Sequence, residues 1–293
     1  MDSHRSSWTT YLLGIAIMLA TVPATTPALA GDDRRYSTMT ADLAWGPLVV
    51  HRFEPTGCVP NRILFVFAGY DRDARAYLRR ARRLARKECF IVYAPDFDRQ
   101  RFPRSRYQRA GVSSRDTSVD SCMGRILDEL ISWAHQREAF SADSYVLFGH
   151  SAGGQMLSRV AAYCPPRGAG RIVIANPSAY VFPNLFELAP YGFGSILDLQ
   201  ERETRLREYL SLPITVYVGS SDQGDELLDI RAAANRQGAN RYLRGLNVYS
   251  EAVQMAEKRG WPMNWRLVIA DGVGHSSRAM LRARNARRAV SGQ

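Results

Sequence analysis

The feature that most constrains the fold is a glycine-flanked serine between a buried strand and a helix. The run Gly149-His150-Ser151-Ala152-Gly153 follows an apolar, β-branched and aromatic stretch and opens a helical pattern rich in small residues. A serine held on such a sharp turn needs glycine two residues before and after it, because side chains there would collide with the turn. The pattern predicts an exposed serine nucleophile at a sheet edge, and an idle serine in a glycine-rich turn is the alternative.

Short apolar runs and amphipathic stretches alternate along the chain. The apolar runs predict strands at 48–53, 63–67, 90–93, 145–148, 172–175, 214–218 and 265–269, the first of them an edge strand. The amphipathic stretches predict helices at about 72–87, 117–137, 152–163, 198–210, 241–259 and 276–289. Apolar strands that alternate with helices are typical of a parallel sheet covered on both sides. We therefore expect one α/β domain over 31–293, with a mostly parallel central sheet and helices on both faces.

Residues 1–30 have the pattern of a secretion signal peptide. Arg5 precedes an apolar stretch that is shorter than the roughly 20 residues needed to span a bilayer. The small-residue pattern Ala28-Leu29-Ala30 is followed by polar residues and suits cleavage after Ala30. We expect a secreted or periplasmic protein with no integral membrane segment after cleavage. An uncleaved anchor is the alternative, because the positive region is thin.

Export makes disulfides plausible for the four cysteines, which are Cys58, Cys89, Cys122 and Cys164. Cys58 and Cys89 each precede a predicted strand, and neighbouring parallel strands begin at one sheet edge, so we expect these two to pair. Cys122 lies near the start of a helix that follows a strand, whereas Cys164 ends a helix at the opposite edge. Most of a helix length would separate them. We expect Cys122 to be a buried free thiol and leave Cys164 undecided. No cysteine has zinc-ligand spacing, so no metal is expected.

A serine hydroxyl needs a histidine base and an orienting carboxylate. In this strand-turn-helix context they follow the serine along the chain in the order acid, histidine. His275 is the one histidine after Ser151, and it lies between the last predicted strand and the last predicted helix. Asp222 is the first carboxylate after the penultimate strand, and Asp225 is the alternative acid. His150 occupies the variable position of the turn, and we expect it to point away from the Ser151 hydroxyl.

Two backbone N–H groups are expected to bind the negative charge that develops on a substrate carbonyl, forming an oxyanion hole. One is the N–H of Ala152, where the dipole of the following helix adds to the attraction. The other is the N–H of Tyr70, in the loop after the first central strand, because Gly69 allows a close backbone approach.

With these motifs in place, the mature chain resembles the α/β-hydrolase superfamily, and its details are similar to the secreted polyhydroxybutyrate depolymerase and feruloyl-esterase-like branch. The similarity rests on Pro95-Asp96-Phe97, Phe102-Pro103, Pro190-Tyr191-Gly192, Asn264-Trp265-Arg266-Leu267-Val268 and Gly272-Val273-Gly274-His275. Ala68 departs from the branch, in which a histidine commonly stands at this position. The resemblance implies ester hydrolysis through an acyl-enzyme without a cofactor. The substrate class stays open between a small ester, a polyester and a decorated polysaccharide.

The formal charge of +11 is carried almost wholly by arginine, because Lys87 and Lys258 are the only lysines. Much of it falls on the predicted helix at 72–87 and near the C-terminus, where it would occupy solvated helix faces. Attraction to an anionic envelope surface is the functional alternative. Nucleic acid is not expected as a partner, because the chain has no recognisable motif for it.

Two other functions use the same residues. A peptidase or amidase would act through the same triad, and a catalytically inactive hydrolase scaffold could dock on an anionic envelope polymer through its basic surface. The long segments 95–116 and 176–197 follow strand ends, where ligands bind in open α/β sheets. We therefore expect substrate contacts in these two segments.

Overall fold

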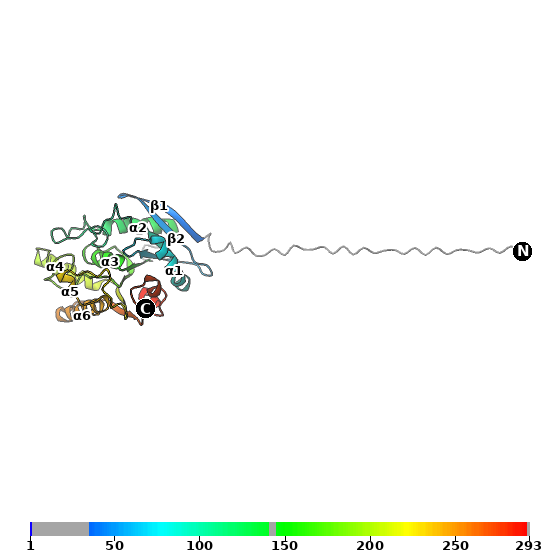
Figure 1. Ribbon diagram of the computed structural model, residues 1–293. Helices are drawn as coiled ribbons and strands as arrows, with labels where there is room; N and C mark the ends of the chain where they lie inside the picture. Colours follow the sequence, from blue (N-terminus) through cyan, green and yellow to red (C-terminus); the bar gives the residue numbers. More distant parts are fainter. Residues whose placement is uncertain (2–34, 141–144, 292–293) are drawn as a thin grey trace.

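The computed structural model describes Met1 and residues 35–140 and 145–291. In these ranges an eight-stranded sheet has the order β1-β2-β4-β3-β5-β6-β7-β8. Figure 1 shows β1 and β2 on the side of the molecule away from α4, α5 and α6. The strands are β1 (Tyr36–Leu43), β2 (Gly46–Phe53), β3 (Arg62–Phe67), β4 (Phe90–Pro95), β5 (Tyr145–His150), β6 (Ala169–Ala175), β7 (Ile214–Gly219) and β8 (Arg266–Ala270). β1 pairs with β2, and β2 with β4, in antiparallel fashion, whereas the remaining pairs are parallel.

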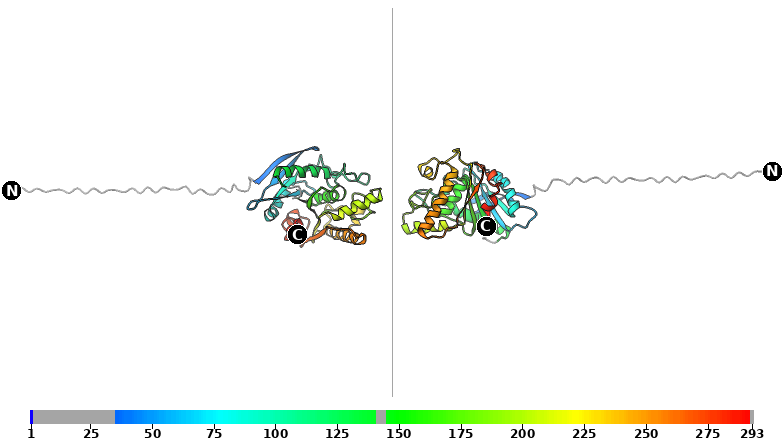
Figure 2. Two further views of the ribbon diagram at one scale, coloured as in Figure 1. Left: turned by 180° about the vertical axis from the view of Figure 1, so that it is seen from behind. Right: turned by 90° about the horizontal axis from the view of Figure 1, so that it is seen from below.

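Helices cover both faces of this sheet. They are α1 (Ala74–Glu88), α2 (Gly124–Glu138), α3 (Ala152–Tyr163), α4 (Leu199–Ser211), α5 (Ala232–Asn235), α6 (Arg241–Arg259), α7 (Ser277–Met280) and α8 (Ala286–Val290). Apolar residues of α2, α3, α4 and α6 share one core, and those of α1, α7 and α8 share the other. Seen from below, α6 and the red C-terminal segment lie on opposite sides of the sheet (Figure 2). The expected single α/β fold is confirmed.

The central strands serve both cores because successive side chains of a strand point to opposite faces. In β3, the side chains of Ile63 and Phe65 belong to the core under α2 and α3, and those of Leu64 and Val66 to the core under α1. All four are fully buried. This two-sided burial explains why the strand is continuously apolar. It also holds the carboxyl end of β3 in place, and the loop at 69–71 follows directly from that end.

The edge of the sheet differs from expectation, because β1 was not among the predicted strands. Serine, threonine and aspartate occupy four of its eight positions and break up any apolar run, and all but one of its side chains are at least partly exposed. An edge strand can have this composition, since its stability comes from backbone pairing with the neighbouring strand as much as from side-chain burial.

Two helices also differ from their predicted bounds. α2 begins at Gly124 rather than near 117, because the side chains of Asp116, Ser118 and Ser121 bond to one another and to nearby backbone groups, which favours turns. The predicted helix at 276–289 is divided into α7 and α8. The Met280 carbonyl accepts a hydrogen bond from the Tyr217 hydroxyl instead of continuing the helix.

The cysteines form two disulfides, one expected and one not. Cys58 is bonded to Cys89, with Cα atoms 6.1 Å apart, as predicted. The prediction that Cys122 is a free thiol is wrong, because it is bonded to Cys164, with Cα atoms 6.2 Å apart. The expectation required α2 to start at the edge of the sheet where β4 ends. Instead, the long connection between them brings the start of α2 against the C-terminal end of α3, where the Gly124 N–H contacts Cys164 Sγ at 3.3 Å.

None of the helices in the described ranges has the length and apolarity that a membrane span requires. The expected signal peptide at 1–30 lies, apart from Met1, outside the described residues.

Candidate active site

Ser151 lies on a strained turn between β5 and α3. Its backbone angles are φ 54° and ψ −113°, in a region that residues with a side chain rarely adopt. A side chain at Gly149 would collide with the backbone of Gly153, and one at Gly153 would collide with the Phe67 carbonyl. The Ser151 N–H is held by the Ala175 carbonyl at 2.9 Å. Both glycines are therefore needed for the tight turn that exposes the hydroxyl.

Three predicted side chains meet at this turn. Ser151 Oγ lies 3.0 Å from His275 Nε2, and His275 Nδ1 lies 2.7 Å from Asp222 Oδ2. The serine comes from the β5–α3 turn, the aspartate from the loop after β7, and the histidine from the loop between β8 and α7. Asp225 is exposed, and within the described residues no hydrogen bond or ion pair joins it to His275.

The carboxylate of Asp222 has a second partner that the sequence analysis missed. Arg241 Nη1, at the start of α6, lies 3.6 Å from Asp222 Oδ1. Only 2 % of Asp222 and 1 % of Arg241 are exposed. Burial lowers the pKa of Arg241, and the charge of Asp222 opposes this shift. Arg241 also donates to the Glu226 carbonyl, so it ties the loop that carries the acid to α6.

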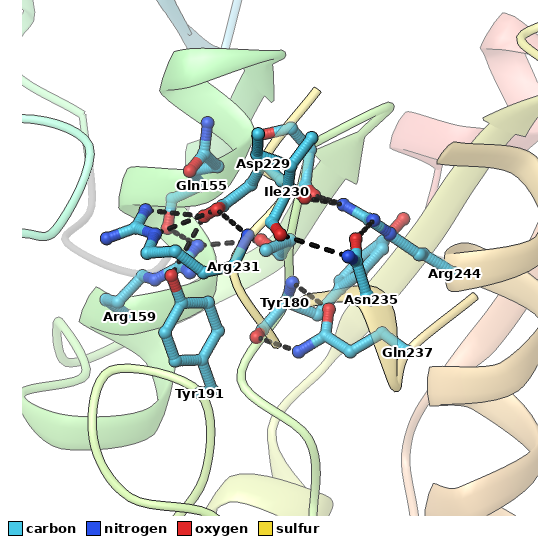
Figure 3. A network of polar contacts seen from close by, with 12 residues as sticks. Gln155, Arg159, Tyr180, Tyr191, Asp229, Ile230, Arg231, Asn235, Gln237 and Arg244 are labelled. Carbon is cyan, nitrogen blue, oxygen red and sulfur yellow. Dashed lines mark hydrogen bonds and ion pairs between the residues drawn. The ribbon is translucent and has the colours of Figure 1, made fainter. Parts of the chain in front are cut away.

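A second buried arginine, Arg244, anchors the far end of the same loop (Figure 3). It donates to the carbonyls of Ser178 and Asp229, the latter at 2.9 Å. Burial alone would raise the pKa of the Asp229 carboxyl, but hydrogen bonds from Arg231 and Tyr191 lower it to about 2. The segment between β7 and α5 is thus held at two points by buried arginines of α6, at the Glu226 carbonyl by Arg241 and at the Asp229 carbonyl by Arg244.

A sequence signal for these arginines exists. The buried residues of α6 include Arg241, Arg244, Val248 and Ala252, at helical spacing. Two arginines on the apolar face of an otherwise amphipathic helix could have marked them as buried and functional.

The loop expected to supply an oxyanion donor is braced by the segment after β4. The Tyr107 hydroxyl donates to the Ala68 carbonyl at 2.8 Å, and Arg99 Nη2 donates to the Tyr70 carbonyl at 2.8 Å. A Cβ on Gly69 would lie 3.5 Å from Ser151 Cβ, so the loop passes close to the serine. Among the described residues, none from the segments 95–116 and 176–197 lines the cleft beside Ser151, so the expected substrate contacts in them stay a prediction. The contacts seen for 95–116 fix the loop of the expected oxyanion donor instead.

His150 is buried beside the triad, with 3 % of its surface exposed. Its Nδ1 lies 2.9 Å from the Tyr77 hydroxyl, and its ring centroid lies 4.9 Å from that of His275. Burial, followed by the charges of His275, Arg241 and Arg80, lowers the pKa of His150 well below its usual value. Its ring nitrogen contacts Tyr77 rather than Ser151, which agrees with the expected orientation.

A cleft of about 720 Å³ opens beside Ser151 and His275. Its walls come from the loop at 69–71, from α1 and from the segment that contains α7. Five arginines line it, which are Arg79, Arg80, Arg82, Arg278 and Arg282, together with three carboxylates, which are Asp71, Asp73 and Glu226. In the part of the chain that the structure describes, no group of three or more histidine, cysteine, aspartate or glutamate side chains could hold a metal ion.

Comparisons with solved structures decide the family. Over 86 % of this chain and 88 % of the other, the fold matches the poly(3-hydroxybutyrate) depolymerase LpqC from Bordetella parapertussis, with 25 % identity and a TM-score of 0.74. It also matches poly(aspartic acid) hydrolase-1 from Sphingomonas sp. KT-1, with 25 % identity, 87 % and 98 % of the chains covered and a TM-score of 0.78. The chain is an α/β-hydrolase. The expected resemblance to this superfamily is confirmed.

The α/β-hydrolase fold is also shared with more distant structures. Siderophore hydrolase EstA from Aspergillus nidulans is 15 % identical, with 89 % of this chain and 96 % of the other covered and a TM-score of 0.51. No protein-family model and no curated protein sequence matches the chain. At the level of the fold family, the relatives support a hydrolase that acts on esters or polymers.

Proposed function

We propose that this α/β-hydrolase is a serine esterase that cleaves carboxylic esters through an acyl-enzyme on Ser151. The observation that carries the proposal is the chain of contacts from Ser151 Oγ through His275 to Asp222, at 3.0 and 2.7 Å. His275 Nε2 takes the proton as Oγ attacks the ester carbonyl, and then returns it to the departing alcohol. Asp222 accepts the Nδ1–H bond and so keeps His275 in the tautomer that can act as a base.

The negative charge on the substrate oxygen would be bound by the N–H groups of Ala152 and Tyr70. Ala152 begins α3, and the Ser151 side chain makes no capping hydrogen bond to that helix, so the hydroxyl is available for His275. Backbone donors held before the reaction stabilise the developing charge without reorganisation. Water, activated by His275, then attacks the acyl-enzyme, releases the acid and regenerates the serine.

We further propose that the protein is exported and acts in the periplasm or outside the cell. Cleavage after Ala30 would leave a hydrolase domain from 31 to 293. Two disulfides support an oxidising compartment. An anionic envelope surface stays a candidate partner because of the charge of +11.

An amide substrate is the second candidate. It is favoured by the similarity to a hydrolase named for poly(aspartic acid), a polymer joined by amide bonds. The similarity to a poly(3-hydroxybutyrate) depolymerase favours an ester instead. Either relative favours a polymer over a small molecule. The inactive envelope-binding alternative has less support, because Ser151, His275 and Asp222 remain in hydrogen-bond contact.

A panel of chromogenic esters and matched anilides tests the proposal. We expect the mature protein to hydrolyse the esters, and Ser151→Ala to lose activity by several orders of magnitude while keeping its fold. Faster turnover of the anilides would identify an amidase. Ester turnover that is unchanged in Ser151→Ala would rule out the proposed nucleophile, and no turnover of either series would favour the binding scaffold.

A further inference from the structure

We propose that the cleft beside Ser151 binds an anionic group of the substrate, so that the preferred substrates carry a carboxylate or a phosphate near the cleaved bond. This inference rests on the proposed hydrolase function and adds the charge of the substrate to it. The inference depends on where the arginines of the cleft lie and on which partners they have.

The arginines come from two parts of the chain that both line the cleft. Arg79 and Arg80 lie on α1, whereas Arg278 lies in α7 and Arg282 follows it. The same cleft contains Ser151 and His275, so a group bound by these arginines belongs to a molecule that reaches the nucleophile. These arginines are separated by about two hundred residues in the chain, and the packing of α1 against α7 brings them to one place.

Three of these arginines have no acidic partner. In the described ranges, no ion pair and no hydrogen bond involves the guanidinium of Arg79, Arg278 or Arg282, and all three residues are exposed. Some exposed arginines elsewhere are paired with a carboxylate, as Arg236 is with Glu187 at 2.6 Å and Arg101 with Asp98 at 2.7 Å. Unneutralised arginines that line one cleft make its potential positive, which attracts anions and is weakened by salt.

Arg80 is already oriented for binding. Its Nη1 donates to Ser277 Oγ at 2.8 Å, and its guanidinium lies 5.1 Å from the centroid of the Tyr77 ring. These contacts restrain a long side chain that would otherwise lose conformational freedom on binding. The planar guanidinium presents paired N–H donors that match the two oxygens of a carboxylate or phosphate.

The carboxylates of the cleft do not cancel this charge. Asp73 accepts a hydrogen bond from the Ala76 N–H at 2.8 Å and caps α1, so it has a structural role. Asp71 and Glu226 come from exposed loops and form no ion pair with the cleft arginines in the described residues. The arginines therefore outnumber the carboxylates, and the cleft should attract anions.

The test compares three 4-nitrophenyl esters of similar size: the succinate, its neutral monomethyl ester, and the 3-phosphonopropionate. We expect the anionic esters to have a kcat/KM about tenfold or more above that of the neutral ester at low ionic strength. The ratio should fall at about 0.5 M salt, which screens exposed charges. The carboxylate and phosphonate arms distinguish which oxyanion the cleft prefers. Butyrate esters of phenol and 4-hydroxybenzoate repeat the comparison with the charge on the alcohol side.

The variant Arg79→Gln/Arg278→Gln/Arg282→Gln should bring the ratio of anionic to neutral turnover close to one. The control Arg83→Gln/Arg104→Gln/Arg207→Gln removes the same charge from exposed arginines that do not line the cleft, and it should keep the wild-type ratio. An equal loss of preference in both variants would overturn the inference, because the effect would then come from net charge alone.

The outcomes separate this inference from the proposed function. Ser151-dependent turnover with no preference for either anionic series would overturn the inference and leave the esterase standing. If no ester is turned over, calorimetry of succinate and of phosphate binding to the Ser151→Ala protein decides. Binding that the cleft variant loses and the control keeps supports the inference, and no binding overturns it.

Discussion

Arg241 and His275 bind the two oxygens of one buried carboxylate, with Arg241 Nη1 3.6 Å from Asp222 Oδ1 and His275 Nδ1 2.7 Å from Asp222 Oδ2. The acid of the proposed triad is thus contacted by a cation on α6 as well as by His275. Arg241 is itself fixed by backbone carbonyls of the loop that carries Asp222. The position of the histidine therefore depends on a residue that does not contact the nucleophile.

Replacement of Arg241 should affect both stability and turnover. In Arg241→Met, Asp222 loses its cationic partner, and breaking a buried ion pair destabilises proteins by about 3–5 kcal/mol. We also expect kcat to fall at least about tenfold, because the carboxylate is no longer held toward His275. Arg241→Lys should recover part of both losses. Urea unfolding and ester kinetics measure these effects, and an unchanged kcat in a folded Arg241→Met protein would contradict this positioning role.

The two candidate acids should respond very differently to amidation. Asp222→Asn should lower kcat by roughly a thousandfold or more, because the amide favours the wrong tautomer of His275. Asp225→Asn changes an exposed side chain without a contact to His275, so its kcat should stay within about twofold of the wild type. Steady-state kinetics on one ester decides between them, and the opposite ranking would move the acid to Asp225.

The sequence was sufficient to predict the residues that meet at the site, because each has a strong local signal. Ser151 lies between two required glycines, His275 is the one histidine after it, and Asp222 directly follows a buried strand. The support behind Asp222 has only a partial signal, because the spacing of Arg241 and Arg244 on α6 indicates burial but not their partners. Arg241 and Arg244 act through tertiary contacts with loops that the chain order does not specify.

His150 should make the protein less stable in acid. Burial, with the charges of His275, Arg241 and Arg80, holds its pKa well below the ordinary value of about 6.5. The unfolded chain then binds a proton before the folded one does, so stability is complete above about pH 6.5 and is lost as the pH falls toward the lowered pKa. Between pH 7 and 5 the wild type should lose on the order of 2 kcal/mol more unfolding free energy than His150→Gln. Urea unfolding at both pH values provides the comparison, and equal losses would show that His150 does not titrate in this range.

The disulfide between Cys122 and Cys164 should stabilise the fold without taking part in turnover. It links residues 42 apart in the chain, and closing a loop of that length contributes on the order of 4 kcal/mol. Cys122→Ser/Cys164→Ser should lower the urea midpoint accordingly while retaining most of the ester turnover of the folded protein. Peptide mapping of unreduced protein should recover the two cysteines linked to each other, and alkylation of Cys122 without prior reduction would disprove the pairing.

The disulfide between Cys122 and Cys164 depends on a chain path that the order of strands and helices does not determine. We placed the start of α2 by the rule that a helix begins where the preceding strand ends. That rule holds for short connections, whereas β4 and α2 are separated by residues 96–123. Over such a length the path of the chain depends on tertiary contacts such as Met123 N–H to the Ala110 carbonyl, at 3.0 Å. Periodicity along the sequence carries no information about these contacts.

Covalent labelling with a fluorophosphonate tests the central claim most directly, because the probe reacts with a serine that a neighbouring histidine has activated. We predict a single adduct on the mature protein, located by peptide mapping at Ser151. Ser151→Ala should not be labelled, and His275→Ala should be labelled at least about a hundredfold more slowly. Undiminished labelling of Ser151→Ala, or no adduct on the folded wild-type protein, would contradict the assignment of Ser151 as the nucleophile.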